Sequence, residues 1–145
     1  MSCMKGKIFF DSNILIYAYT HGEPAKCEKS KDLLRRAFEG EIEATISNQV
    51  IGELSRALIT KFDVSVSEIE SIIDDLNRYI GLNKVSYGPE TIKTAVRYSD
   101  AYGVPFWDSV IAATMKENGI IEIITENDRD FSDIPEIQVT NPFKH

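Results

Sequence analysis

The stretch Ile8-Phe9-Phe10-Asp11 places a carboxylate directly after an apolar run. Together with Lys7, these three large apolar residues predict a strand over residues 7–10 that is buried on both faces. In open α/β sheets, ligands bind outside the carboxyl ends of the strands. Asp11 therefore marks a candidate site at the edge of a sheet.

Strands and helices alternate along the rest of the chain. Short apolar segments predict further strands over residues 42–46, 84–86 and 120–124. Apolar periodicity, with capping residues, Gly or Pro at the ends, predicts helices over residues 25–39, 48–60, 67–80, 89–102 and 106–118. This alternation predicts an α/β fold in which a central, mainly parallel sheet is flanked by helices on both faces.

The length and composition fit a soluble globular domain. A chain of 145 residues can bury one core but is too short to suggest two, so we expect a single domain over residues 1–145. The longest apolar stretch, residues 8–19, is interrupted by Asp11 and Asn13 and is shorter than the ~20 residues of a membrane-spanning helix. Because no uninterrupted apolar segment or cleavage site follows the N-terminal cations, we expect a cytoplasmic protein with no membrane contact.

The charge and the cysteines exclude some classes of function. A formal net charge of -7 argues against a broad basic face for duplex DNA, but it is compatible with acids that hold divalent cations and thereby attract phosphate. The basic residues within 26–36 alternate with acids, which is typical of a solvated helix face. Cys3 and Cys27 form no CxxC pair, so we expect neither a zinc site nor a disulfide framework.

Other acids map to the same sheet edge as Asp11. Helices that connect parallel strands begin at the edge where those strands end. Asp108 lies in the first turn of the helix predicted over 106–118, and residues 125–128 follow the strand over 120–124. Glu53 lies about one and a half turns into its helix, beside the apolar stripe, from which it can reach the edge. These acids are therefore expected to converge.

Converging carboxylates need a compensating charge. Two unit charges ~4 Å apart repel by roughly 4 kcal/mol at an effective dielectric near 20, so a proton or a cation must be taken up. Oxygen ligands without a plausible His set or thiolate cluster suit a hard cation, Mg²⁺ or Mn²⁺. Such ions activate water and stabilise the charge that develops in phosphodiester cleavage. The predicted reaction is hydrolysis at phosphorus.

Each acid also has an ordinary structural explanation when taken alone. Asp11 could cap the following turn and Asp108 the start of its helix, because Asp is a preferred capping residue. Glu53 could be a solvated helix charge. The remaining acids lie in a polar loop: Asp128, Asp130 and Asp133. The joint placement of the acids favours a site.

The chain resembles the PIN-domain ribonucleases, and among them the VapC-type toxins of toxin–antitoxin pairs. The resemblance covers nearly the whole chain. The motifs that carry it are Phe10-Asp11-Ser12-Asn13-Ile14-Leu15, Val50-Ile51-Gly52-Glu53-Leu54, Phe106-Trp107-Asp108, Ile124-Thr125, Asp128-Arg129-Asp130-Phe131 and Asn141-Pro142-Phe143. It implies a three-layer PIN-like fold.

The resemblance also implies a set of site residues. Asp11, Glu53 and Asp108 would form an acidic triad that holds Mg²⁺ or Mn²⁺, with Asn13 and Thr125 as supporting polar groups. The family often places a fourth Asp or Asn soon after this Thr. Three residues fit that position: Asn127, Asp128 and Asp130. Asp128 is preferred because it carries charge three residues before Phe131, and Asp130 is held in reserve.

The function implied is a metal-dependent endoribonuclease acting on RNA, with a homodimeric assembly and an antitoxin that covers the acidic pocket. Two other interpretations stay open. A phosphatase or phosphoacceptor domain also places Asp at strand ends, although Asn13 stands where a haloacid-dehalogenase-like site has its second Asp, and the Lys of receiver-like domains does not follow the last strand. A PIN-like binding module without turnover is disfavoured by the complete set of acids.

Overall fold

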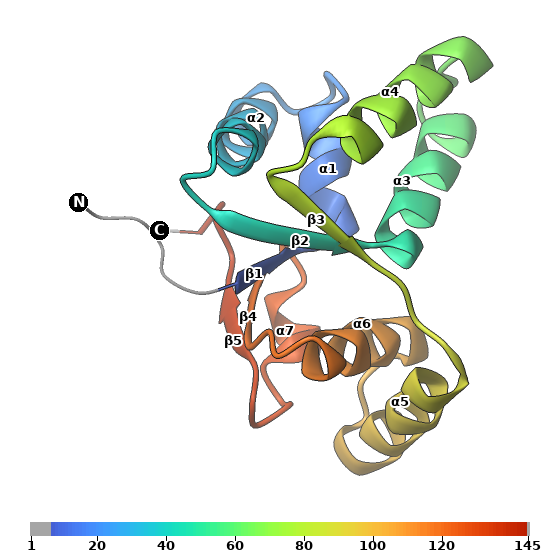
Figure 1. The fold of residues 1–145 in the computed structure, drawn as a ribbon, viewed down its shortest axis with the longest axis vertical. Helices are drawn as coiled ribbons and strands as arrows, with labels where there is room; N and C mark the ends of the chain where they lie inside the picture. The colour runs from blue at the N-terminus through green and yellow to red at the C-terminus, as the bar shows by residue number, and fades with distance from the viewer. Residues whose placement is uncertain (1–6, 145) are drawn as a thin grey trace.

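The structure is a computed structural model that describes residues 7–144. Its centre is a five-stranded sheet in which every pair of neighbouring strands is parallel, in the order β3-β2-β1-β4-β5 (Figure 1). The strands are β1 (Lys7–Phe10), β2 (Glu43–Ser47), β3 (Leu82–Val85), β4 (Glu122–Ile124) and β5 (Gln138–Thr140). The predicted parallel sheet is confirmed.

Helices cover both faces of this sheet and give three layers (Figure 1). On one face lie α1 (Ser12–Ala18), α2 (Pro24–Phe38), α3 (Asn48–Thr60) and α4 (Val66–Arg78). The opposite face carries α5 (Pro89–Tyr102) and α6 (Phe106–Glu117), and α6 contacts the short α7 (Asp128–Phe131). The predicted three-layer α/β fold is confirmed.

Strand β1 is the switch point of the sheet, with β2 and β3 on one side of it and β4 and β5 on the other. The chain moves outward from β1 to β2 and β3, then crosses to β4 on the other side of β1. Connections on the two faces diverge at this switch point and leave a crevice at the carboxyl ends of the strands, where ligands bind in such sheets. Asp11 and Thr125 follow β1 and β4 there, and the Asp11 amide donates to the Ile124 carbonyl at 3.1 Å.

The core forms on both faces of β1. Ile8, Phe9 and Phe10 have no exposed surface, which confirms the prediction of a strand buried on both sides. They belong to one apolar cluster with residues of α3 and α6, among them Leu54 and Ile111. Burying each such side chain contributes about 1.5–3 kcal/mol, so the start of the chain anchors the sheet on which the acids are placed.

The sequence did not predict α1, α7 and β5. Helix α1 follows β1 without a loop because the Ser12 amide donates to the Asp11 side chain at 2.7 Å, which caps the helix. Helix α7 and strand β5 are too short for a periodic pattern to develop. Strand β4 begins at Glu122, two residues later than predicted, since the Ile120 amide still donates to Met115 at the end of α6.

The expectations about a membrane span and about the cysteines can be compared with the structure only over residues 7–144. No helix within residues 7–144 is long and apolar enough to cross a membrane. Cys27 is a buried free thiol. Cys3 and the N-terminal cations considered as an export signal lie outside the described residues.

Candidate active site

Asp11 follows β1 at the carboxyl edge of the sheet and has only 2% of its surface exposed. Its Oδ2 accepts a hydrogen bond from the Thr125 hydroxyl at 2.7 Å, and its Oδ1 accepts from the Ser12 amide at 2.7 Å. Burial raises the pKa of Asp11, although both hydrogen bonds oppose this shift. The carboxylate is therefore fixed in position but short of compensating positive charge.

Asn13 and Thr125 link the segment after β4 to Asp11. The side-chain amide of Asn13 donates to the Thr125 hydroxyl at 3.2 Å and, weakly, to the Asp11 carboxylate at 3.4 Å. The Asn13 side-chain oxygen accepts from the Glu126 amide at 3.1 Å, while the Asn127 amide donates to the Thr125 hydroxyl at 2.9 Å. These contacts hold residues 125–127 against the end of β1.

Glu53 reaches the crevice from α3. Its Oε2 accepts a weak hydrogen bond from Gln49 at 3.4 Å, and Gln49 also donates to the Trp107 carbonyl at 3.0 Å. The other oxygen, Oε1, is buried with no hydrogen-bond partner among residues 7–144. Burial and then the negative charge of Asp11 raise the pKa of Glu53. An oxygen of this kind needs a proton or a cation.

Asp108 enters from the first turn of α6. Burial contributes most to raising its pKa to about 8, followed by a hydrogen bond with Asp130 and the charges of Asp11, Asp130 and Glu53. Because the charges of the other three acids contribute to this shift, the four acids share one electrostatic environment.

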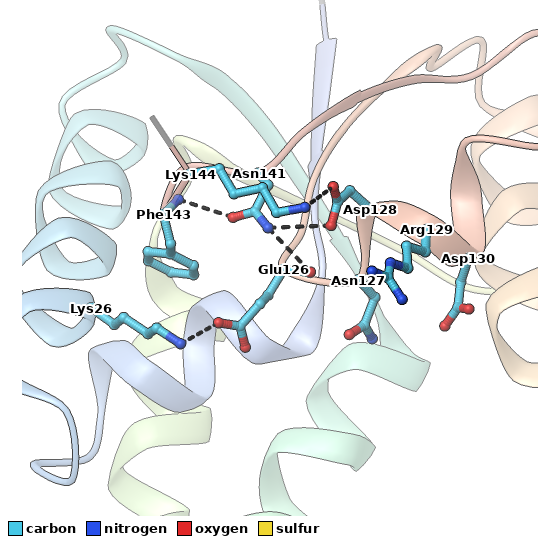
Figure 2. Close-up of a pocket in the computed structure, with 9 residues that line it drawn as sticks. All are labelled: Lys26, Glu126, Asn127, Asp128, Arg129, Asp130, Asn141, Phe143 and Lys144. Carbon is cyan, nitrogen blue, oxygen red and sulfur yellow. Dashed lines mark hydrogen bonds and ion pairs between the residues drawn. The ribbon is translucent and has the colours of Figure 1, made fainter.

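Asp128 and Asp130 point in different directions from α7. Asp128 accepts from Lys144 at 2.8 Å and from Asn141 at 3.3 Å, and Lys144 lowers the pKa of Asp128. Figure 2 shows its carboxylate turned toward these two residues, with Asp130 projecting elsewhere. Residues two apart on a helix differ by about 200° in direction, so only one of the two acids can face α6. The structure brings Asp130, the reserve candidate, to Asp108, and pairs Asp128 with Lys144.

A cavity of about 490 Å³ adjoins the acids on the α7 side (Figure 2). It is lined by Lys26, Glu126, Asn127, Asp128, Arg129, Asp130, Asn141, Phe143 and Lys144. Lys26 forms an ion pair with Glu126 and is only 31% exposed, so the prediction of a solvated helix face is wrong for this residue. Arg129 forms no ion pair within residues 7–144. It is the cation in this cavity that is free to bind an anion.

A second hollow of about 350 Å³ adjoins Glu53 on the α3 side. It is lined by Asn48, Gln49, Gly52, Glu53, Arg56, Tyr87 and Trp107, which we call the Trp107 hollow. Asp130 lines the first cavity and Glu53 lines the second. The acids therefore lie between two concave surfaces.

The donor set suits a hard divalent cation. Asp11, Glu53, Asp108 and Asp130 offer only carboxylate oxygens, which such ions prefer, and the unpartnered Glu53 Oε1 is an available ligand atom. Within residues 7–144, no three His, Cys, Asp or Glu side chains are drawn together closely enough to form a ready-made metal site.

The PIN domain family model matches residues 8–137, which include all four acids. The chain belongs to the PIN domain family. Members of this family are nucleases, so the acids of this PIN domain lie in a fold used for phosphodiester hydrolysis.

Solved structures share the fold over most of their length. A toxin–antitoxin complex from Klebsiella pneumoniae aligns with a TM-score of 0.70 and 22% identity, over 95% of this PIN domain chain and 99% of the other. FitAcB from Neisseria gonorrhoeae aligns with a TM-score of 0.66 and 17% identity over 95% and 99%. VapC20 of Mycobacterium tuberculosis, a sarcin–ricin loop cleaving toxin, aligns with a TM-score of 0.64 and 18% identity over 80% and 86%. Among curated proteins, none matches the sequence.

Two residues of this PIN domain site were missed at the level of sequence. Gln49 lies four residues before Glu53, and this spacing places the two on one helix face, so a local signal existed. The backbone carbonyl of Trp107 accepts a hydrogen bond from Gln49, which lies 58 residues earlier in the chain. No local sequence pattern could predict that contact.

Proposed function

We propose that this PIN domain is a divalent-cation-dependent endoribonuclease and the toxin of a toxin–antitoxin pair. The observation that supports nuclease activity is the cluster of Asp11, Glu53, Asp108 and Asp130, in which burial and mutual repulsion raise the pKa of three members. RNA as the substrate is supported by the shared fold with a toxin that cleaves the sarcin–ricin loop. The toxin role is supported by the shared fold with toxin–antitoxin complexes.

Mg²⁺ or Mn²⁺ would be held by Asp11, Glu53 and Asp108, with either Asp130 or Asp128 as the fourth group. When bound, such an ion supplies Lewis-acid chemistry, which activates water and stabilises charge on the phosphoryl oxygens. The raised pKa values mean that binding the cation must displace protons from this cluster.

The residues around the cluster orient its carboxylates. The Thr125 hydroxyl and the Ser12 amide fix the two oxygens of Asp11, each at 2.7 Å. Gln49 ties Glu53 to the backbone of α6 through the Trp107 carbonyl, so α3 and α6 present Glu53 and Asp108 together. Asp130 lies close enough to Asp108 to contribute to the raised pKa of Asp108.

The two concave surfaces suit a nucleic acid strand that crosses the acids. Arg129 in the first cavity and Arg56 in the Trp107 hollow form no ion pair within residues 7–144. Guanidinium groups bind phosphate oxygens through paired hydrogen bonds. We therefore expect these arginines to contact phosphates on either side of the bond that is cleaved.

We further propose a single domain over residues 1–145, a homodimer, an antitoxin protein that covers the acidic pocket, and a cytoplasmic location. The support for the antitoxin is that a structure of the same fold is a toxin–antitoxin complex, from Klebsiella pneumoniae. The homodimer rests on the family resemblance.

The test is an assay of the purified protein on tRNA, ribosomal RNA fragments and single-stranded DNA. We expect cleavage of RNA with Mn²⁺, none with EDTA, and a loss of roughly 100-fold or more in the Asp11→Asn variant, which keeps an oxygen for the Ser12 amide. Activity that survives EDTA or Asp11→Asn would contradict the mechanism. Hydrolysis of p-nitrophenyl phosphate without nuclease action would favour a phosphatase, and metal binding without turnover would favour a binding module.

The fourth acid can be identified with a matched pair of variants. If Asp130 is the fourth group, Asp130→Asn should lower the cleavage rate by about 10- to 100-fold, as for groups that support a metal site. Asp128→Asn should lower it much less, because Asp128 is paired with Lys144. The opposite order of effects would assign the position to Asp128.

A further inference from the structure

We propose that the Trp107 hollow is a nucleobase subsite, which binds an unpaired base of the RNA strand next to the phosphate that is cleaved. This proposal rests on the proposed nuclease function, because it names how that site holds its substrate. It is supported by four features of the hollow: an exposed aromatic surface, an unpartnered amide oxygen, an unpaired arginine, and direct continuity with the acids.

The aromatic surface is formed by Trp107 and Tyr87. Trp107 is 52% exposed, and its ring contacts that of Phe106 edge-on, with the centroids 5.0 Å apart. Every nucleobase has a flat face that stacks on an aromatic side chain, so this surface suits an unpaired base of any sequence.

The amide oxygen belongs to Gln49, which is 9% exposed and lines the hollow. Its Nε2 is committed to Glu53 and to the Trp107 carbonyl, both of them acceptors, which fixes the orientation of the amide. The remaining Oε1 is buried and has no hydrogen-bond partner among residues 7–144. This unsatisfied acceptor belongs to a side chain in the wall of the hollow, and accepting from the exocyclic amino group of a base would require a side-chain shift that exposes it.

Arg56 supplies positive charge at the mouth of the hollow. It lies on α3 one turn after Glu53, and it forms no ion pair within residues 7–144. On a chain with a net charge of -7, an unpaired cation beside an acidic cluster suits the phosphate attached to the bound base.

The hollow is continuous with the acidic cluster. Glu53 lines it, and Asp108 directly follows Trp107 in the chain, so a base stacked on the indole would place its phosphate beside the acids. Beside the aromatic rings, the hollow is lined by the polar side chains of Asn48, Gln49 and Arg56. An apolar surface for stacking next to polar groups for hydrogen bonds suits an unpaired nucleotide.

Trp107 is the only tryptophan of the chain, so its fluorescence reports directly on this hollow. The experiment uses the full chain carrying Asp11→Asn, in Mg²⁺, titrated with oligoadenylate and with an abasic oligomer of the same length. We expect oligoadenylate to quench the indole emission saturably, and the abasic oligomer to leave it unchanged. Equal responses to the two oligomers would overturn the proposal.

A second measurement uses fluorescently labelled oligoadenylate and its anisotropy. Trp107→Ala should weaken binding by about 5- to 140-fold, the range expected from loss of one stacked base, and Trp107→Phe should recover part of the affinity. Tyr102→Ala is the matched control, because Tyr102 is an exposed aromatic residue outside the hollow, and it should leave the affinity unchanged. Circular dichroism verifies that each variant is folded.

The outcomes separate this proposal from the nuclease proposal. If the wild-type protein cleaves RNA but Trp107→Ala binds oligoadenylate normally, the base subsite is wrong and the nuclease stands. If Trp107→Ala changes the sedimentation of the protein and not its affinity for RNA, the hollow is an interface between copies and the base subsite is wrong. Absence of cleavage and of binding for every nucleic acid would overturn both proposals.

Discussion

Asp11 caps α1 at the end of β1, and we propose that it is also a carboxylate of the active site. It caps α1 through the Ser12 amide, which by itself would be an ordinary reason for an Asp at this position. A helix cap does not require a buried side chain, however. Asp11 is only 2% exposed, and this burial raises its pKa. The burial and the Thr125 hydrogen bond are what distinguish a site carboxylate from a simple cap.

The pKa of Asp108 predicts how the stability of the metal-free protein depends on pH. Its pKa is about 8 in the folded protein, compared with 3.8 for an ordinary Asp, so the folded state binds more protons than the unfolded state between these values. The free energy of unfolding therefore falls as pH rises from about 4 to about 8. Urea unfolding in EDTA at pH 5 and at pH 8 measures the change.

Asp108→Asn tests the origin of this pH dependence. We expect the variant to lose most of the difference between pH 5 and pH 8, because the titrating carboxyl group is gone. Asp74→Asn is a suitable control, since Asp74 is exposed on α4 and forms no ion pair within the described residues. An unchanged pH dependence in Asp108→Asn would show that burial of Asp108 does not destabilise the fold.

At the scale of elements, the sequence was informative wherever an element was long or wholly buried. Strand β1 was predictable because its apolar residues are consecutive, and α5 and α6 were predictable from Gly and Pro at their ends. Asp11 and Asp108 could be assigned to one edge because each lies at the end of such an element, and Glu53 because it lies beside the apolar stripe of its helix.

The choice between Asp128 and Asp130 could not be made from sequence. It depends on the direction of side chains on α7, which has four residues and no periodic pattern. In the sequence, charge favoured Asp128 over Asn127 and left Asp130 in reserve, whereas the structure pairs Asp128 with Lys144. That pair spans 16 residues, and its geometry is set by tertiary structure rather than by local sequence.

The turn between α4 and β3 packs tightly on the end of α2. A Cβ added at Gly81 would lie 2.7 Å from the Ala37 carbonyl oxygen, which is backbone and cannot move aside. We expect Gly81→Ala to lower the free energy of unfolding by about 1–3 kcal/mol, as for other overpacked sites. Gly52→Ala is the control, because a Cβ added at this position in α3 has no heavy atom within 4 Å. Gly52→Ala should raise the free energy of unfolding by up to about 1 kcal/mol. Urea unfolding measures both, and equal effects would contradict the packing argument.

At the scale of the whole molecule, acids outnumber basic residues by 23 to 16. Several cations near the site are already engaged, Lys26 by Glu126 and Lys144 by Asp128. For the proposed RNA substrate, we therefore do not expect the affinity to come from a broad basic surface. We expect it to come from the proposed cation, from base contacts, and from Arg56 and Arg129, which line the two cavities and form no ion pair within residues 7–144.

This distribution of charge predicts a weak dependence of RNA binding on salt. Each phosphate neutralised on a single strand contributes about -0.7 to the slope of log K against log salt, so Arg56 and Arg129 together predict a slope of roughly -1.4. Binding of labelled single-stranded RNA to the Asp11→Asn variant at fixed Mg²⁺ gives this slope. Arg56→Ala and Arg129→Ala should each make it shallower by about 0.7. Arg97→Ala is the control, because Arg97 is exposed on α5 outside both cavities, and it should leave the slope unchanged. A slope steeper than about -3 for the protein with all its arginines, or an equal effect of Arg97→Ala, would indicate a basic surface elsewhere on the molecule.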